Sequence, residues 1–164
     1  MRILGIDPGL ATMGYGIIDV EGSRLRPIEY GTIETSSKTA YSKRLYQLFE
    51  ELTKIIRESE PDEVAMEELF FNKNITTAIS VAQARGVEIL ACMQEGLEIY
   101  EYTPLQIKQA VVGYGRADKR QVQEMVKMYL HLKEIPRPDD AADGLAIAIT
   151  HIHSSNSKEI FKLK

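Results

Sequence analysis

The first twenty residues limit what this chain can fold into more than any other stretch. Residues 3–6 form an apolar run typical of a central strand, and the run ends at Asp7, just before the turn signal Pro8-Gly9. A second strand-like run, residues 14–20, follows closely enough to pair with it as an antiparallel hairpin. A buried, unpaired carboxylate costs several kcal/mol, so Asp7 is expected to meet a cation, a metal ion or water.

Strand and helix patterns alternate along the rest of the chain. Apolar residues recur every three or four positions over residues 41–57, which predicts an amphipathic helix on a sheet. The strand predicted at 64–66 follows this helical crossover, so it is expected to lie parallel to the first strand and beside it. The other expected elements are strands at 24–34 and 97–102 and helices at 76–95, 104–112, about 119–132 and about 139–153.

This order predicts an α/β fold with a five-stranded mixed sheet, whose first three strands form an antiparallel meander and whose two faces are covered by helices. The helix at 76–95 is rich in small residues, which allow close approach to a neighbour. That neighbour is either the sheet or the same helix of a second subunit.

Length and composition predict one domain without a membrane span. The chain of 164 residues is long enough for a single core, and no apolar run approaches the roughly 20 residues of a membrane span. We expect residues 1–154 to form the domain and residues 155–164 a polar, frayed tail. The chain opens on strand residues without an export signal, and its single cysteine, Cys92, is expected to be a small buried side chain. These features predict a cytoplasmic protein with no membrane partner.

Charge is distributed unevenly along the chain. The formal net charge of −4, taken alone, argues against nucleic acid as a partner. Residues 50–68 carry a net charge of −6, whereas residues 103–138 carry seven cations and three acids, a net charge of +4. The second segment therefore predicts one basic face on an otherwise acidic protein.

Acidic side chains occur at the ends of two predicted buried strands and in the first turn of the last helix. Asp140 and Asp143 lie about one turn apart on one helix face, and the small residues around them let this helix approach the sheet closely. Capping explains acids at a helix start, but it does not explain Asp7 or the Glu67-Glu68 pair that ends the next buried strand. Converging carboxylates require divalent cations, and oxygen ligands alone favour Mg²⁺ or Mn²⁺.

The predicted acid cluster suits hydrolysis of phosphodiesters. Two metal ions about 4 Å apart are the usual apparatus for this reaction, since one activates water and the other stabilises the leaving oxygen. Neighbouring strand residues point to opposite faces, so the pattern does not choose between Glu67 and Glu68. His151 and His153 do not share a helix face and are interpreted as packing or surface residues.

Several segments together resemble the RuvC family of Holliday junction resolvases. They are Gly5-Ile6-Asp7-Pro8-Gly9, Gly14-Tyr15-Gly16, Met66-Glu67 followed by Phe70, Gln83-Ala84-Arg85-Gly86-Val87, and the run Asp140 to Ala148 that begins DAADG. They follow the family's order and spacing over residues 1–154. The acids alone would suit many nucleases of the ribonuclease H-like fold, whereas the QARG and DAAD segments together are specific to this family.

The resemblance implies a ribonuclease H-like fold and a homodimeric endonuclease that nicks two strands of a four-way DNA junction, working beside the RuvA and RuvB branch-migration complex. The family's catalytic residues match five positions: Asp7, Glu67, Asp140, Asp143 and Lys119. By the same resemblance, the four acids among them also bind metal, with two Mg²⁺ ions per site. Its DNA contacts match Phe70, Lys108 and Lys119. Further candidates for phosphate contact, chosen by charge, are Lys73, Arg85, Arg116 and Arg120.

Other interpretations stay open at this point. Phe70 either packs in the core just past its strand or stacks on a base. Another ribonuclease H-like hydrolase, such as one that cuts RNA in a hybrid or a general nuclease, fits the same acids. An ATP-binding domain of the actin and sugar-kinase type needs two lobes, and this chain supplies one. A junction-binding protein without catalysis would be unaffected by Asp140→Asn in every assay.

Overall fold

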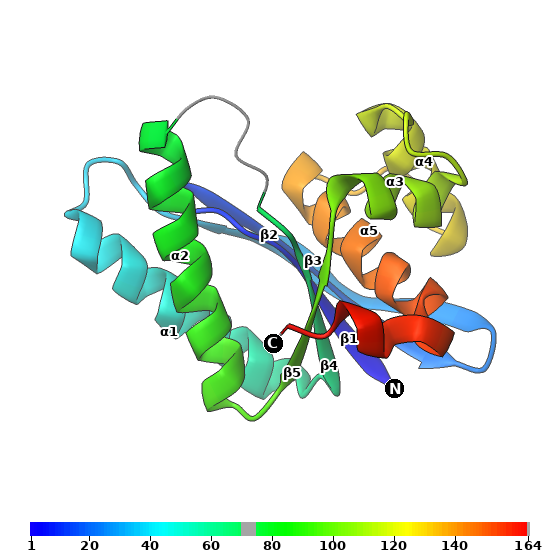
Figure 1. The fold of residues 1–164 in the computed structure, drawn as a ribbon, viewed down its shortest axis with the longest axis horizontal. Coiled ribbons are helices and arrows are strands. Elements are labelled where there is room, and N and C mark those ends of the chain that lie inside the picture. The colour runs from blue at the N-terminus through cyan, green and yellow to red at the C-terminus, as the bar shows by residue number, and fades with distance from the viewer. Residues whose placement is uncertain (70–74, 164) are drawn as a thin grey trace.

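The computed structural model describes residues 1–69 and 75–163, in which five strands form one mixed sheet (Figure 1). The strands are β1 (Arg2–Asp7), β2 (Thr12–Glu21), β3 (Arg24–Glu34), β4 (Glu63–Glu67) and β5 (Glu98–Tyr102), in the spatial order β3-β2-β1-β4-β5. Pairing is antiparallel among β1, β2 and β3, and parallel for β1 with β4 and β4 with β5. The predicted meander and the parallel strand beside β1 are both confirmed.

Helices cover both faces of this sheet (Figure 1). On one face lie α1 (Tyr41–Ser59) and α2 (Ile75–Gln94), and on the other lie α3 (Pro104–Val112), α4 (Lys119–Tyr129) and α5 (Asp139–His153). Side chains alternate along a strand, so β1 contributes to both cores. Leu4 and Ile6 pack with α1 and α2, whereas Ile3 packs with α5. No helix within the described ranges is long and apolar enough to cross a membrane.

Local signals explain where α3 and α4 begin and end. Each starts with a capping box, in which the side chains of Thr103 and Asp118 accept hydrogen bonds from backbone N–H groups three residues later. Gly113 ends α3 with a left-handed backbone (φ 95°). The structure ends α4 at Tyr129, earlier than expected, and His131 then adopts φ 51°. The caps fix a short loop, residues 113–118, between the two helices.

The last helix, α5, lies directly on β1 and β2 because residues at the crossing have no side chain. A Cβ atom on Gly144 would lie 2.5 Å from the carbonyl carbon of Tyr15, and one on Gly14 would lie 2.0 Å from the carbonyl oxygen of Asp140. Any larger residue would push the helix off the sheet. Gly14 pairs with Asp7 across the hairpin, so this close contact brings the start of α5 to the end of β1.

The segment after residue 154 differs from the expected frayed tail. It forms a 3-10 helix, η1 (Ser155–Phe161), and its lysines reach back to the sheet. Lys158 pairs with Glu63 at the start of β4, and Lys162 pairs with Glu98 at the start of β5. Sequence pattern missed this order because its contacts, which also include the Tyr100–Lys162 bridge and the packing of Phe161 on Tyr102, join residues far apart in the chain.

The cysteine and the two histidines of the last helix take structural roles. Cys92 is fully buried in α2, as expected for a small apolar side chain. The buried ring of His151 contacts the hydroxyl oxygen of Tyr102 at 2.7 Å and a carboxylate oxygen of Glu63 at 2.8 Å. His153 is exposed and contacts a backbone oxygen of α3. The packing and surface interpretation of both histidines is confirmed.

Candidate active site

Three aspartates from two elements meet at the carboxyl end of β1. Asp7 is the last residue of β1, and Asp140 and Asp143 lie at the start of α5. One carboxylate oxygen from each lies within 4.8 Å of those of the other two. Oxygens this close are typical of ligands to one hard cation. The convergence expected from the sequence therefore agrees with the geometry for these three side chains.

Glu67 stands beside this cluster and Glu68 does not. The parallel register pairs Met66 of β4 with Ile6 of β1, so Glu67 follows at the same edge of the sheet as Asp7. Glu67 is partly buried and lines a pocket of about 270 Å³, whereas Glu68 is exposed. The register and side-chain alternation of β4 thus place Glu67, and not Glu68, at the pocket, a choice that the sequence pattern leaves open. Glu67 is adjacent to the three converging oxygens and not one of that set.

Burial and mutual repulsion work against ionisation of these acids. Burial, followed by the charge of Glu67, raises the pKa of Asp7 to about 8. Burial is also the main reason why the pKa values of Glu67 and Asp143 are raised, although nearby lysines oppose the shift. Acids held together at such a cost are typical of a functional site that binds cations.

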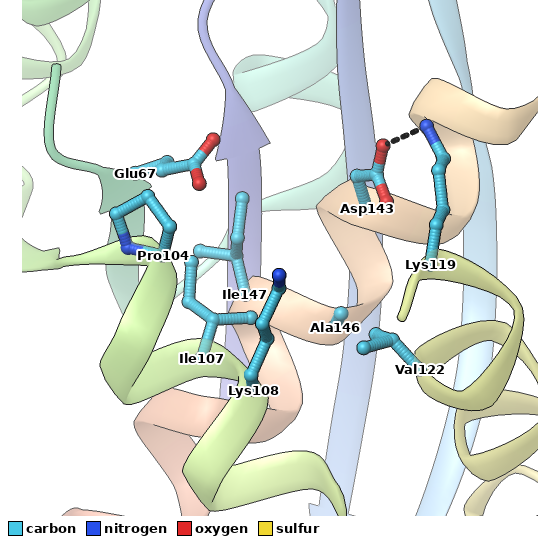
Figure 2. Close-up of a pocket in the computed structure, with 9 residues that line it drawn as sticks. All are labelled: Glu67, Pro104, Ile107, Lys108, Lys119, Val122, Asp143, Ala146 and Ile147. Atoms are coloured by element: carbon cyan, nitrogen blue, oxygen red, sulfur yellow. Dashed lines mark hydrogen bonds and ion pairs between the residues drawn. The ribbon is translucent and has the colours of Figure 1, made fainter. Parts of the chain in front are cut away.

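Two lysines line the same pocket as Glu67 and Asp143 (Figure 2). Figure 2 shows Lys119, the first residue of α4, in an ion pair with Asp143, with Nζ and the carboxylate oxygen 2.8 Å apart. Lys108 extends from α3 into the space between Glu67 and Asp143. The Lys119 side chain is 52% exposed, so it can reach a ligand without leaving the site. Both predicted lysines therefore lie at the acid cluster.

The pocket floor is apolar, which the sequence analysis did not anticipate. Its lining residues come from α3, α4 and α5: Pro104, Ile107, Val122, Ala146 and Ile147. An apolar floor lowers the local dielectric and strengthens each charge interaction above it. One sequence signal for this pocket is available, the capping box at Thr103. It fixes the residue at which α3 begins and hence the direction in which Lys108 extends.

The remaining predicted DNA contacts divide into three groups. Arg116 and Arg120 are exposed beside Lys119, and within the described chain neither has a carboxylate partner. Arg85 is in a different place, since its guanidinium pairs with Glu101 of β5 and its side chain is only 14% exposed. Phe70 and Lys73 lie outside the described residues.

The donor set itself tests whether a metal ion fits. Asp7, Asp140 and Asp143 offer closely spaced carboxylate oxygens with no sulfur or imidazole among them, which suits Mg²⁺ or Mn²⁺. Asp139, the neighbouring acid, is not part of this set, because it pairs with Arg137 and has no capping role. The residues present therefore fit a hard divalent cation.

The sheet has this mixed strand order, and its acids lie at the ends of the adjacent strands β1 and β4 and on a helix that packs across them. This combination defines a nuclease of the ribonuclease H-like class. The sequence model of the family described as crossover junction endodeoxyribonuclease RuvC matches residues 3–151. The chain belongs to the RuvC family.

Relatives cover the whole chain. The crossover junction endodeoxyribonuclease RuvC of Finegoldia magna is 60% identical over 164 residues, and that of Alkaliphilus metalliredigens is 56% identical, with all of each chain aligned in both cases. The solved structure of Thermus thermophilus RuvC in complex with a Holliday junction substrate superimposes with a TM-score of 0.91 at 33% identity, covering 99% of this chain and 100% of the other.

Proposed function

We propose that this protein resolves four-way DNA junctions by two symmetric phosphodiester cleavages, one at the acid cluster of each subunit of a homodimer. The observation that carries the proposal is the meeting of three aspartate oxygens within 4.8 Å in a site that Lys108 and Lys119 border. Family membership names the reaction, and the Thermus relative binds a Holliday junction substrate.

Four acids, Asp7, Glu67, Asp140 and Asp143, would hold two Mg²⁺ ions, for which Mn²⁺ can substitute. Bound there, such ions would supply an activated water nucleophile and stabilise the leaving oxygen. Apolar side chains of α3, α4 and α5 line the pocket beside Glu67 and Asp143 and lower the local dielectric around these acids. The raised pKa of Asp7, about 8, means that metal binding at neutral pH would also release a proton from this side chain.

The basic residues around the acids give the chain a way to hold the DNA backbone. Lys119 and Lys108 border the acids, where they can contact the phosphate that is cut. Arg116 and Arg120 extend the positive surface along the loop and the first turn of α4. Contacts of this type supply affinity and orientation without base specificity. We leave Arg85 out of this surface because Glu101 already neutralises it.

An apolar stripe along α2 supports the homodimer. We define the stripe by five exposed residues at helical spacing: Ile79, Ala82, Gly86, Leu90 and Met93. Ile79, Leu90 and Met93 are 56–57% exposed, which is unusual for large apolar side chains on one helix face. A Cβ on Gly86 would meet nothing within 4 Å, so no contact with the described residues explains this glycine.

A two-fold dimer would place two acid clusters in matching positions on a junction that is itself two-fold symmetric. This arrangement gives a physical reason for paired cuts of like polarity. Cooperation with the RuvA and RuvB branch-migration complex belongs to the same proposal and rests on the family alone.

The test incubates the protein with a synthetic four-way junction, once with Mg²⁺ and once with a chelator in its place. Linear duplex and an RNA–DNA hybrid serve as comparison substrates. We expect symmetric paired cuts in the junction only, and only with Mg²⁺. Asp140→Asn should abolish cutting and keep junction binding, while Asp139→Asn, its matched neighbour outside the cluster, should cut normally.

Other outcomes would identify a different protein. Equal cutting of linear duplex would identify a general nuclease, and cutting of the hybrid would identify an RNA-directed enzyme. Junction binding without cutting by any form of the protein would leave only a binding role. A cleavage loss in Asp139→Asn as large as that in Asp140→Asn would remove the acid cluster from the proposal.

A further inference from the structure

Glu88 is a carboxyl side chain buried completely inside the protein. It lies in α2 and has 0% of its surface exposed. Its neighbours one turn away on the same helix face, Ala84 and Cys92, are equally buried. Within the described chain, no ion pair compensates for this burial. An acid in such surroundings is costly, so a specific contact has to justify it.

That contact is with the turn that follows Asp7. The backbone N–H of Gly9 donates a hydrogen bond to Oε1 of Glu88, at 3.2 Å. The other carboxyl oxygen, Oε2, is buried with no hydrogen-bond partner in the structure. The single hydrogen bond therefore joins α2 to a residue two positions after Asp7.

The same turn is held from its other side. Thr35, just after β3, donates a side-chain hydrogen bond to the carbonyl oxygen of Leu10, and its backbone N–H bonds to the carbonyl of Ala11 at 3.0 Å. Gly9 itself has no room for a side chain, because a Cβ atom would lie 2.0 Å from the carbonyl oxygen of Thr12. Glu88 is thus one of two ties on a tight turn.

Glu88 is well suited to act as a neutral acceptor. Burial raises the pKa of Glu88 to about 8, although the hydrogen bond from Gly9 and the charge of Arg85 both oppose this shift. At neutral pH the side chain is therefore mostly a carboxylic acid, whose carbonyl oxygen accepts a hydrogen bond as a glutamine amide does.

We propose that Glu88 is a positioning residue, which ties Gly9 to α2 and so holds Asp7 in place beside Glu67 and Asp143. The inference rests on the proposed function of Asp7. It predicts that the tie matters more for turnover than for folding, because a buried acid with an unpaired oxygen stabilises nothing by itself.

Two substitutions at this position separate the hydrogen bond from the packing. Glu88→Gln keeps an acceptor of the same shape, and Glu88→Met keeps the volume without one. Cys92→Ala is the matched control, since it disturbs the same buried face of α2 but has no hydrogen bond to the turn.

We expect Glu88→Met to lower kcat about 10- to 100-fold, as loss of an orienting partner commonly does, with unchanged junction affinity in chelator and an unchanged or higher melting temperature. Glu88→Gln and Cys92→Ala should stay within about threefold of wild type. Hydrogen exchange should show the Gly9 amide protected in wild type and Glu88→Gln but exposed in Glu88→Met.

The exchange measurement separates this inference from the proposed function, because it needs no cleavage. If wild type fails to cut junctions, the proposed function fails, while protection of the Gly9 amide still reports on the tie. Equal turnover and equal amide protection in Glu88→Met and wild type would overturn the inference. Unfolding of both Glu88→Met and a second apolar variant, Glu88→Leu, would also overturn the inference, since the Glu88 side chain would then stabilise α2 rather than the turn.

Discussion

At the scale of single residues, the site is a set of charges whose repulsion is only partly offset within the chain. Lys119 is the cation that directly pairs with an acid of the cluster, through Asp143, among the residues whose contacts are described. Because the Lys119 side chain is half exposed, a DNA phosphate can also contact its ammonium group. Lys119 therefore links the acids to the DNA in the proposed mechanism.

Replacement of Lys119 by alanine should slow junction cleavage while the protein stays folded. We expect a loss of turnover of about 10- to 100-fold, as for removal of a charge that stabilises a transition state. The slope of log affinity against log salt should also become shallower by about one, the value for one lost phosphate contact. Single-turnover cleavage and a salt titration of binding measure the two effects.

Lys133→Ala provides the matched control, since Lys133 is exposed in the same basic segment but lies past the opposite end of α4. A helix of 11 residues puts about 16 Å between the ends of α4. Normal cleavage by Lys119→Ala, or an equal defect in Lys133→Ala, would remove Lys119 from the catalytic set.

At the scale of elements, α2 has two faces with different tasks. Its inner face buries Ala84, Glu88 and Cys92 against the sheet side of the molecule. Its outer face carries the apolar stripe with Gly86 at its centre. The small residues noted in the sequence therefore lie on both faces: Ala84 packs inside the subunit, and Gly86 lies on the face that is proposed to meet a second subunit.

A charge on the stripe should separate the proposed dimer without unfolding the subunit. In Leu90→Glu the new carboxylate sits at a position 57% exposed, so the monomer gains nothing unfavourable, whereas a dimer would have to bury the charge. We expect sedimentation velocity to show monomers and junction cleavage to yield unpaired single nicks.

Met128→Glu is the matched control, because Met128 is 56% exposed and lies on α4, on the opposite side of the sheet (Figure 1). This variant should sediment as wild type does. Dimers of undiminished stability in Leu90→Glu would show that copies of this chain associate through another surface.

At the scale of the whole molecule, the fold holds carboxylates close enough to repel one another, and a bound metal ion would reduce this repulsion. Close packing of α5 on the sheet brings Asp7, Asp140 and Asp143 together at the end of β1. The free energy of unfolding should therefore depend on pH and on divalent cations through these side chains.

The sign follows from the raised pKa of Asp7, about 8 in the folded protein against about 4 when unfolded. Its favourable contribution is complete below about pH 4 and is lost as the pH rises through about 8. In chelator, Asp7→Asn should therefore be more stable than wild type, with an advantage that grows by about 1–3 kcal/mol between pH 5 and pH 8.

Thermal melts with and without Mg²⁺ measure this effect. Mg²⁺ should raise the melting temperature of wild type at pH 8 and have less effect on Asp7→Asn, with Asp139→Asn responding as wild type does. A wild-type protein that melts at the same temperature as Asp7→Asn at every pH, with no response to Mg²⁺, would contradict the proposed cation site.

The sequence by itself determined the elements and the identity of most site residues. Period and turn signals identified the strands and helices, because these patterns are local consequences of backbone geometry. Acids at the ends of buried strands identified Asp7 and narrowed a second position to Glu67 or Glu68, because burial of a carboxylate needs a reason. The spacing of Asp140 and Asp143 placed both on one helix face.

Tertiary structure alone decided matters that depend on contacts between distant residues. The register and side-chain alternation of β4 placed Glu67 at the pocket beside Asp7, Glu101 paired with Arg85, and contacts with β4 and β5 ordered the segment after residue 154. The hydrogen bond from Gly9 to Glu88 spans 79 positions of the chain. No local pattern carries such information, because the energy of each contact appears only when both partners have been brought together by the fold.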